Sequence, residues 1–368
     1  MTTGARPSRA AKPALGEPIL DVTNLSVRFH TETSTVLAVD AVDLEVEAGE
    51  IVGIVGESGC GKSVTSMSLT GLLPRSASIT GTASLAGIPL VGARGKALRR
   101  LRGKEIAYIF QEPMNSLNPV MTVGSQIVEA LREHLDLSKA EARKRAIDLL
   151  RLVNIPSAEI RFDQYPHQLS GGMRQRVMIA MAVACEPKLL VADEPTTALD
   201  VTVQAGILDV LRELRARLGT SILIITHDLG VIADVADRVV VMYAGRVVEQ
   251  ADVDELFARP MHRYTFGLLG ASPTPDTHSG EARLSEIPGL VPVLEDSPNR
   301  CTFVERCPAA VERCAAERPP LREVPTAAGG LHAVACWNPV DEAALAARPS
   351  RSNVGAPPTP RADEEGPQ

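Results

Sequence analysis

The sequence predicts an α/β fold with a largely parallel sheet, and three observations support this prediction. First, Gly56–Ser63 reads G-E-S-G-C-G-K-S and directly follows the apolar run Ile51–Val55, the strand, loop and helix order of the G-x-x-x-x-G-K-[ST] motif. Second, short apolar runs recur, each of a length typical of strands buried on both faces. Third, stretches with helical periodicity lie between them. The runs are Ile106–Phe110, Leu189–Ala192, Ile222–Ile225 and Val239–Met242.

The remaining elements can be placed in order along the chain. Leu20–Val46 alternates as two strands separated by a polar turn at Thr31–Thr35, as expected of half-buried strands. The segment Thr122–Ala184 contains no comparable strand, so we expect a helical insertion there. Apolar residues recur at helical spacing from Ile207 to Leu218. We expect this stripe to pack in the core and Gly219 to end its helix.

Composition limits the classes of protein that the chain can represent. The 368 residues are 45% hydrophobic, enough for one large domain plus an appendage. The net charge of −7 gives no basic surplus, so we expect no nucleic-acid partner. No apolar run approaches the roughly 18 residues that cross a bilayer. Residues 1–18 carry basic side chains with no apolar segment behind them, which predicts a flexible lead in a cytoplasmic chain rather than a secretion signal.

The glycine-rich motif predicts a site for nucleotide phosphates. Its glycines let the backbone curl and direct N–H groups at phosphate oxygens. In this pattern Lys62 reaches the β- and γ-phosphates and the Ser63 hydroxyl reaches Mg²⁺. We expect Cys60 to be inert, at a position that needs a small side chain. The predicted ATP-binding residues of this loop are Gly56, Glu57, Ser58, Gly59, Cys60, Gly61, Lys62 and Ser63.

Two adjacent carboxylates close a later apolar strand. Asp193 and Glu194 follow Leu189–Ala192, as in an ATPase that holds Mg²⁺ with one acid and polarises water with the next. We expect Asp193 on the strand beside the phosphate loop and Glu194 facing the γ-phosphate as general base. The alternative is a pair of strand-end acids turned to solvent.

These motifs together resemble those of an ATP-binding subunit of an ABC transporter, over about residues 19–260. The resemblance implies a P-loop ABC ATPase domain with a RecA-like core, an antiparallel β subdomain and a helical subdomain at about residues 112–184. It rests on signals that occur in the family's order: the phosphate loop, Gln111, Leu169-Ser170-Gly171-Gly172, the Asp193/Glu194 pair, Ala198-Leu199-Asp200 and His227.

The resemblance implies a site shared between two chains. Ser170, Gly171 and Gly172 open a helix, so a hydroxyl, backbone N–H groups and the positive end of the helix dipole face an anion. In this family the anion is the γ-phosphate of ATP bound to the partner subunit. Two ATP molecules are then sandwiched between two heads, and Asp200 matches the residue that communicates across the dimer.

Three further residues receive roles from the resemblance. Gln111 matches the glutamine that senses Mg²⁺ and the attacking water and couples the site to the membrane subunit. His227 matches the switch histidine that contacts the γ-phosphate. Phe29 aligns with the aromatic residue that stacks on adenine, although a phenylalanine in a strand is usually a core residue. The expected catalytic set is Glu194, His227, Gln111 and Lys62, with Ser63, Gln111 and Asp193 as Mg²⁺ ligands.

The character of the chain changes after Pro260. Prolines multiply, and four cysteines follow within 36 residues. Their spacing matches neither zinc ribbons nor ferredoxin runs, so disulfides, zinc, an iron–sulfur cluster and plain buried thiols remain open. We expect an extension at residues 261–340 and a disordered tail at 341–368. The cysteines are Cys301, Cys307, Cys314 and Cys336.

This extension resembles the C-terminal extension of oligopeptide/dipeptide ABC-transporter ATP-binding subunits. Arg306-Cys307-Pro308, Glu317–Leu321 and the His332 to Cys336 ending carry the resemblance. It implies a four-cysteine [4Fe–4S] site, which we interpret as structural. The chain departs from the pattern at Arg300, where a glycine commonly precedes the first cysteine.

The expected function is ATP hydrolysis that energises peptide import from the cytoplasmic face of the membrane. The implied partners are a second ATP-binding subunit in a heterodimer, two transmembrane permeases and an external substrate-binding protein. Import of nickel, an opine or another small solute is the nearer alternative. A non-transport ABC ATPase is the more distant one, and it calls for a basic groove or coiled-coil insertion that the sequence lacks.

Overall fold

The computed structural model describes residues 18–32, 34–93, 95–111, 116–197, 199–271, 287–326 and 329–346. Of the predicted lead, only Pro18 falls within these ranges, and the predicted disordered tail lies outside them from residue 347 onward. Residues 341–346 are described and include a short helix, α13 (Glu342–Ala346). Disorder from residue 341 is therefore wrong for this stretch, where the Asp341 carboxylate accepts a hydrogen bond from the Ala344 amide at 2.7 Å and caps the helix.

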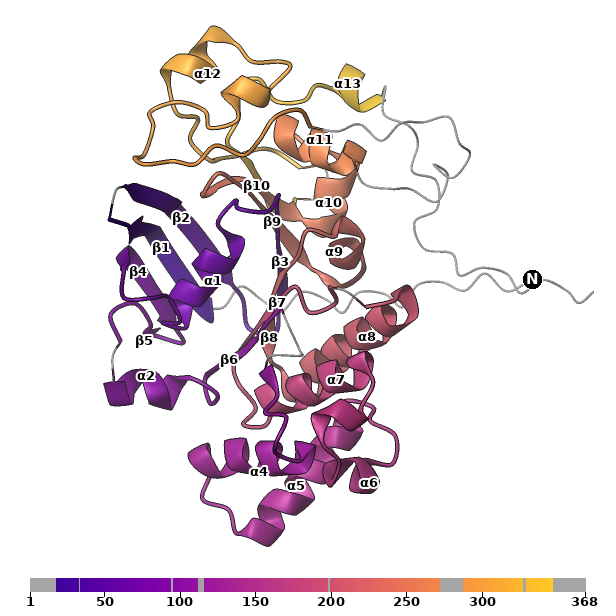
Figure 1. The fold of residues 1–368 in the computed structure, drawn as a ribbon. Coiled ribbons are helices and arrows are strands. Elements are labelled where there is room, and N and C mark those ends of the chain that lie inside the picture. The colour runs from indigo at the N-terminus through magenta and orange to yellow at the C-terminus, as the bar shows by residue number, and fades with distance from the viewer. Residues whose placement is uncertain are drawn as a thin grey trace, which may run out of the picture.

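Two sheets form the centre of the molecule (Figure 1). The larger has the strand order β11-β12-β10-β9-β3-β8-β7-β6, and its strands from β9 to β6 pair in parallel. This confirms the predicted parallel sheet. Its strands are β3 (Ile51–Val55), β6 (Ile106–Ile109), β7 (Leu189–Asp193), β8 (Ser221–Ile225), β9 (Arg238–Tyr243), β10 (Arg246–Asp252), β11 (Arg322–Glu323) and β12 (His332–Val334).

The smaller sheet is antiparallel and has the order β2-β1-β4-β5. The predicted pair of strands between Leu20 and Val46 forms its β1 and β2. The strand β4 was not predicted, because its sequence ASITGTASL alternates weakly and contains a glycine. The members of this sheet are β1 (Leu20–His30), β2 (Thr35–Val46), β4 (Ala77–Leu85) and β5 (Ile88–Pro89).

Helices surround the larger sheet and gather at one end of the molecule (Figure 1). Helices α4 to α7 pack on one another at the lower end of the view, in the segment predicted as a helical insertion. The predicted stripe from Ile207 to Leu218 lies on α8, and Gly219 ends that helix at φ 67°. The helices are α1 (Lys62–Leu69), α2 (Gly95–Leu101), α4 (Val123–His134), α5 (Lys139–Leu152), α6 (Ala158–Phe162), α7 (Gly171–Ala182), α8 (Val201–Leu218), α9 (Leu229–Val235), α10 (Val253–Ala258), α11 (Arg263–Ala271) and α12 (Glu312–Ala316).

The central strands separate two apolar cores. On β3, Ile51 and Val55 face the core shared with the helices, whereas Val52 and Ile54 face the core shared with the smaller sheet. Successive side chains of a strand point to opposite faces, so a strand covered on both sides is apolar throughout. This geometry explains the uninterrupted apolar runs of the sequence and the burial of all five β3 residues.

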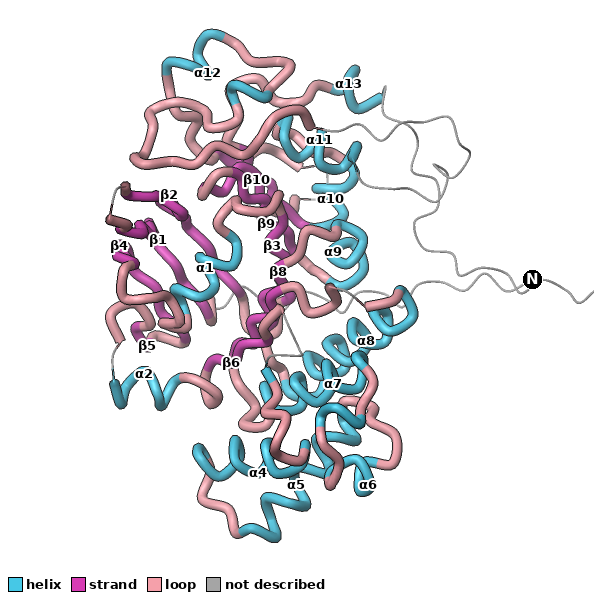
Figure 2. The backbone as a smooth tube through the Cα atoms, in the orientation of Figure 1, coloured by secondary structure: helices cyan, strands magenta, loops and turns pink. Residues whose placement is uncertain are grey.

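The extension is joined to the larger sheet instead of forming a unit of its own. Its strand β12 pairs antiparallel with β10, and β11 pairs with β12. The expected appendage is thus part of the larger sheet, where it covers the hydrogen-bonding edge that β10 would otherwise expose. Figure 2 shows that most of the remaining extension is loop.

Candidate functional site

The phosphate loop connects β3 to α1 and needs glycine for its path. Gly56 and Gly61 have φ angles of 154° and 99°. A Cβ atom would lie 2.3 Å from the Met242 carbonyl oxygen at Gly56, and 2.5 Å from the Ala38 carbonyl oxygen at Gly61. Both distances are too short for a side chain. The backbone curl expected from the motif therefore depends on these two residues.

Lys62 lies at the start of α1 and points back into the loop. Its ammonium donates to the carbonyl oxygens of Gly56 at 2.8 Å and Glu57 at 2.9 Å. The residue is only 7% exposed, so this charge is held in place by the loop. Cys60 is buried beside it, and burial raises the pKa of the Cys60 thiol. A neutral buried thiol is in keeping with the inert role expected for that position.

Ser63 and Asp193 lie in contact although they are 130 residues apart. The Ser63 hydroxyl donates to the carboxylate of Asp193 at 3.1 Å, and the Tyr108 hydroxyl donates to its other oxygen at 2.7 Å. Burial raises the pKa of Asp193, and these two hydrogen bonds oppose the shift. A carboxylate and a hydroxyl are hard oxygen donors, so the pair fits the chemistry of Mg²⁺.

The strand of Asp193 is not the neighbour of the phosphate-loop strand. β3 pairs with β8 and β9, and β8 separates it from β7. The strand beside the phosphate loop that carries Asp193 is therefore not the sheet neighbour of β3. The contact with Ser63 still forms, because the loop and α1 leave the carboxyl end of β3, the edge where β7 also ends.

Glu194 receives hydrogen bonds from three separate segments. Gln111 Nε2 donates to Glu194 Oε2 at 2.8 Å, and the Thr197 hydroxyl donates to the same oxygen at 2.8 Å. Nδ1 of His227 lies 3.1 Å from Glu194 Oε1. Burial favours the neutral acid, but the contacts with Thr197 and His227 outweigh it and lower the pKa of Glu194. The group is therefore ionised at neutral pH and able to accept a proton.

The Leu-Ser-Gly-Gly segment is carried by a different part of the structure from the phosphate loop. Ser170 is the N-cap of α7 and accepts from the Met173 amide at 3.4 Å, and Ser170 and Gly171 are exposed. α7 packs against α4, α5, α8 and β6, whereas α1 packs against β1 and β2. Asp200 is the N-cap of α8 and accepts from the Val203 amide at 2.9 Å. Ala198, which precedes it in the motif, lies outside the described residues.

Phe29 lies near the end of β1, opposite Val36 on β2 and Ala77 on β4. Its side chain is partly buried against the core beneath the smaller sheet. This packing fits the core interpretation of a strand phenylalanine. Adenine stacking on Phe29 stays a prediction.

The four cysteines of the extension are free thiols in one neighbourhood. Burial, together with charge interactions with Cys314, Cys336 and Cys307, raises the pKa of Cys301 to about 11. Within the described residues, no group of three or more His, Cys, Asp or Glu side chains is arranged to hold a metal ion. The thiols therefore lie close together without forming a ready ligand set.

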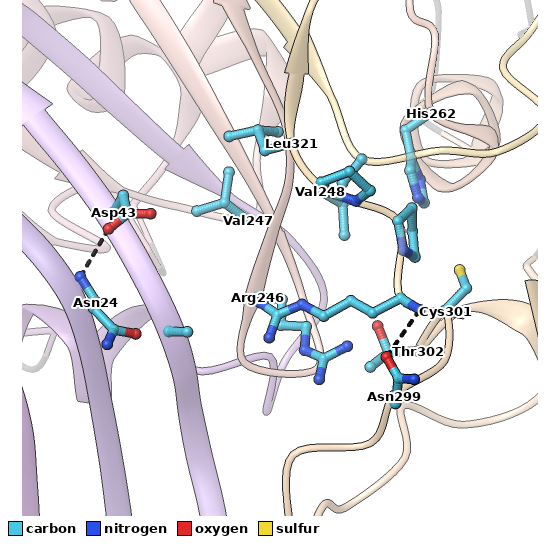
Figure 3. A pocket seen from close by; sticks show the side chains of 15 residues that line it. Asn24, Asp43, Arg246, Val247, Val248, His262, Asn299, Cys301, Thr302 and Leu321 are labelled. Carbon is cyan, nitrogen blue, oxygen red and sulfur yellow. Dashed lines mark hydrogen bonds between the residues drawn. The ribbon is translucent and has the colours of Figure 1, made fainter. Parts of the chain in front are cut away.

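Cys301 also lines a cavity of about 550 Å³ between the smaller sheet and the extension (Figure 3). Asn24 and Asp43 lie on the far wall, where the backbone N–H of Asn24 donates to the Asp43 carboxylate at 2.7 Å. Arg246 lies between the two walls and is only 5% exposed. Its guanidinium is fully engaged with Asp40, Ser297 and the carbonyl oxygens of Pro298 and Arg300, so this cavity is a junction between parts of the chain.

Four residues at the nucleotide motifs were missed in the sequence. Tyr108 and Thr197 hold the two acids, while Tyr264 and Arg306 contact Glu57 of the phosphate loop. Tyr108 lies on the strand that leads to Gln111, and Thr197 lies three residues after Glu194, so both had a local signal. Tyr264 and Arg306 had none, because they are 207 and 249 residues from Glu57.

Two family profiles match the chain. The profile described as "ABC transporter" matches residues 39–197, and the profile described as "Oligopeptide/dipeptide transporter, C-terminal region" matches residues 248–314. The second match includes three of the four extension cysteines.

Relatives of similar length share about half of the residues. A probable peptide ABC transporter ATP-binding protein from Sinorhizobium fredii is 51% identical over 322 residues, covering 87% of this chain and 94% of that protein. The oligopeptide transport ATP-binding protein AppD of Bacillus subtilis is 49% identical over 306 residues, covering 82% and 92%.

Solved structures show the same similarity in space. A dimeric ATP-binding cassette in a post-hydrolysis state with ADP and Pi aligns with a TM-score of 0.58 at 28% identity, covering 64% of this chain and 98% of that one. The cassette cbiO1 from Clostridium perfringens, part of an ABC transporter complex, aligns with a TM-score of 0.56 at 31% identity, covering 66% and 92%.

Proposed function

This chain belongs to the ATP-binding subunits of oligopeptide importers in the ABC transporter family, and we propose from that premise how its residues divide the work. The chain binds and hydrolyses ATP and thereby energises peptide import. The observation that carries the proposed mechanism is the Glu194 carboxylate, held by Gln111, Thr197 and His227 close to the Ser63–Asp193 pair.

Binding of the phosphates falls to the loop and Lys62. The Lys62 ammonium donates hydrogen bonds to the carbonyl oxygens of Gly56 and Glu57. When ATP binds, the ammonium can donate instead to the β- and γ-phosphate oxygens, which carry more negative charge. Ser63 and Asp193 provide the oxygen ligands for Mg²⁺, which when bound would neutralise charge on the phosphates.

Activation of water falls to Glu194. Its ionised carboxylate accepts the proton of the attacking water as general base. Gln111 and His227 each contact a different oxygen of the carboxylate, and both side chains are exposed and so open to a nucleotide. In the proposed division of roles, Gln111 senses the attacking water and His227 contacts the γ-phosphate.

The chain completes its site with a second subunit. Ser170, Gly171 and Gly172 present a helix N-terminus on a surface separate from the phosphate loop, suited to a phosphate bound elsewhere. We propose that they close the ATP site of a partner ATP-binding subunit, with Asp200 beside them at the start of α8. A heterodimer with a related second subunit is the proposed assembly.

Two permease subunits are the proposed membrane partners. An apolar groove of about 300 Å³ lies between β6 and the helical segment, lined among others by Phe110, Leu117, Met178 and Met181. Phe110 is 41% exposed and immediately precedes Gln111, so a permease segment in this groove would touch the strand that leads to the γ-phosphate site. Among the described residues, none of the helices has the length and apolar character needed to span a bilayer.

The substrate class rests on the relatives. Proteins named as peptide or oligopeptide transport subunits support peptides as the cargo, delivered by an extracytoplasmic binding protein. The proposed location is the cytoplasmic face of the membrane. Selection of the cargo would rest with the permeases and the binding protein, so nickel, an opine or another solute stays the alternative.

We also propose that Cys301, Cys307, Cys314 and Cys336 hold a structural [4Fe–4S] cluster. Support comes from the match to the oligopeptide-transporter C-terminal region and from four free thiols in one neighbourhood. Thiolates suit iron–sulfur chemistry, and small shifts of the loops would have to bring the four sulfur atoms together.

Iron content tests the cluster directly. The full chain purified without oxygen should contain iron and absorb visible light, and Cys314→Ser should reduce both. The control is Cys185→Ser, which alters a half-buried thiol outside the extension. Absence of both signals would remove the cluster, and bound zinc in its place would favour the zinc alternative.

Glu194→Gln tests the catalytic assignment. The amide keeps the size of the side chain but does not accept a proton, so we expect the rate of phosphate release to fall roughly 10²- to 10⁴-fold. ATP should still bind, and the variant should accumulate as an ATP-bound dimer on size-exclusion chromatography. Glu312→Gln, an exposed change on α12, is the control. Hydrolysis by Glu194→Gln at the wild-type rate would show that Glu194 is not the base.

A further inference from the structure

We propose that Arg306 of the extension is a positioning residue for the phosphate loop, and that it sets nucleotide affinity by neutralising and holding Glu57. This inference rests on the loop being the ATP site. It adds to the proposed function a contact through which the cysteine-bearing extension acts on nucleotide binding.

The first observation is an ion pair between the nearly buried Arg306 of the extension and the partly exposed Glu57 of the phosphate loop. Nη1 of Arg306 lies 3.0 Å and 3.2 Å from the two carboxylate oxygens of Glu57. The Arg306 side chain is 7% exposed and that of Glu57 is 28% exposed. The guanidinium is oriented by its other nitrogens, which donate to the carbonyl oxygens of Pro288 at 2.8 Å and Ile287 at 3.0 Å. The geometry of the pair is therefore set by the fold of the extension.

The second observation is that the backbone of Glu57 is held from the same side. Its amide donates to the Tyr264 hydroxyl at 2.8 Å. The rings of Tyr264, Tyr243 and Phe303 pack together with centroid distances of 4.7 to 5.5 Å, and the Tyr243 hydroxyl lies 3.3 Å from Arg306 Nη1. Phe303 lies three residues before Arg306. Side chain and backbone of Glu57 are thus fixed by one cluster that includes the extension.

The third observation is that the extension also borders the loop through its backbone. The Leu37 amide on β2 donates to the Leu294 carbonyl oxygen at 2.7 Å. A cavity of about 520 Å³ is lined by Glu57–Gly59 on one side and by Leu290–Leu294 on the other. The position of Arg306 against Glu57 is therefore one of several contacts along this boundary.

The Arg306–Glu57 ion pair affects nucleotide binding through its electrostatics. A carboxylate in a loop that binds polyphosphate repels the ligand unless its charge is compensated. Arg306 supplies the compensating charge from a nearly buried position, where solvent screening is weak. Loss of Arg306 alone leaves Glu57 uncompensated beside the phosphates, whereas loss of both charges removes the repulsion. The two substitutions should therefore be strongly non-additive.

Binding of a fluorescent ATP analogue to the full chain, measured without hydrolysis, tests this inference. We expect Arg306→Gln to weaken affinity tenfold or more in the wild-type background, but by less than threefold in the Glu57→Gln background. In steady-state kinetics, the weaker affinity of Arg306→Gln should appear as a higher KM for ATP, with kcat nearly unchanged. The control is Arg300→Gln, which removes an exposed ion pair with Glu305 in the same extension.

Thermal unfolding of each variant separates a loss of affinity from a loss of fold. If Arg306→Gln is unfolded at the assay temperature, Arg306→Lys takes its place: it keeps the charge, loses the carbonyl contacts and should bind about threefold more weakly. The inference is overturned if whichever Arg306 variant is folded binds the analogue with wild-type affinity. It is also overturned if the Arg306→Gln/Glu57→Gln double variant binds the analogue as weakly as Arg306→Gln does. A wild-type chain that does not bind the analogue would instead contradict the proposed function.

Discussion

At the scale of the residue, Glu194 shows how the end of a strand can present a carboxylate to several partners. β7 ends at Asp193, and Glu194 adopts a φ of 47°, a conformation that non-glycine residues rarely adopt. Its amide donates to the Ile225 carbonyl oxygen at 2.8 Å. This contact fixes the turn and presents the carboxylate to Gln111, Thr197 and His227. Such strain at a residue held by three partners is typical of a functional position.

Thr197→Val tests how far the environment of Glu194 sets its reactivity. The change removes a hydrogen bond that favours the ionised carboxylate, so the pKa of Glu194 should rise and the acidic limb of the kcat profile should move to higher pH. We expect kcat at neutral pH to change by no more than about threefold, because a hydrogen bond to a charged group contributes roughly 1.5–3 kcal/mol, or about one to two pKa units, and the carboxylate therefore stays largely ionised there. Rates of phosphate release across a pH series measure both effects. Thr82→Val, on the exposed part of β4, should change neither, and an unshifted limb in Thr197→Val would contradict the argument.

At the scale of the element, the start of α7 is set by its contact with α8. Ser170 and Asp200 cap the two helices, and the helices approach closely at Gly172. A Cβ atom there would lie 2.6 Å from Cγ1 of Val203, whereas one at Gly171 would have its nearest neighbour, Leu199, at 4.0 Å. The second glycine therefore has a packing reason of its own, in addition to any contact with phosphate.

Gly172→Ala should force α7 and α8 apart. We expect the free energy of unfolding to fall by about 1–3 kcal/mol, as for overpacking in a tight interface. Gly171→Ala is the matched control, because the adjacent position has room for a methyl group. Val203→Ala should restore part of the stability lost in Gly172→Ala, since it removes the atom that clashes. Chemical denaturation of the three single variants and of the Gly172→Ala/Val203→Ala double variant measures these free energies of unfolding. Equal stabilities for Gly172→Ala and Gly171→Ala would refute the packing explanation.

At the scale of the whole molecule, a buried polar network joins the extension to the cassette. Glu249 on β10 is fully buried and accepts hydrogen bonds from the amides of Met261 and His262. Nε2 of His332 on β12 lies 2.8 Å from its carboxylate. His262 is itself 1% exposed, and its Nδ1 accepts from the Tyr264 amide at 3.1 Å. The segment that leads into the extension thus depends on a neutral imidazole.

Stability should therefore depend on pH through His262. Burial lowers the pKa of His262 from 6.5 to about 4, and the charge of Glu249 only partly opposes this. Between these values the unfolded chain binds more protons than the folded one, so stability should fall as the pH falls through 6.5 and level off near 4. The loss is on the order of 3 kcal/mol. Unfolding curves between pH 4 and 8 measure it.

His262→Asn is the control for that dependence. The asparagine side chain can accept the same amide hydrogen bond through its oxygen but does not titrate, so the slope of stability against pH should become shallower. A histidine titration followed by NMR in the wild-type chain gives a second reading that does not require the variant to fold. A His262 pKa near 6.5 would rule out this source of pH dependence.

The local sequence pattern by itself determined several strands, the phosphate loop and one helix end of this protein. The uninterrupted apolar runs, the glycines of the phosphate loop and the cap at Gly219 each reflect a physical requirement within a few residues. The motif order also identified the family. The tertiary structure alone placed β8 between β3 and β7, joined β12 to β10, and brought Arg306 to Glu57 across 249 residues. Such contacts depend on how the elements pack and not on local periodicity, so no spacing in the sequence announces them.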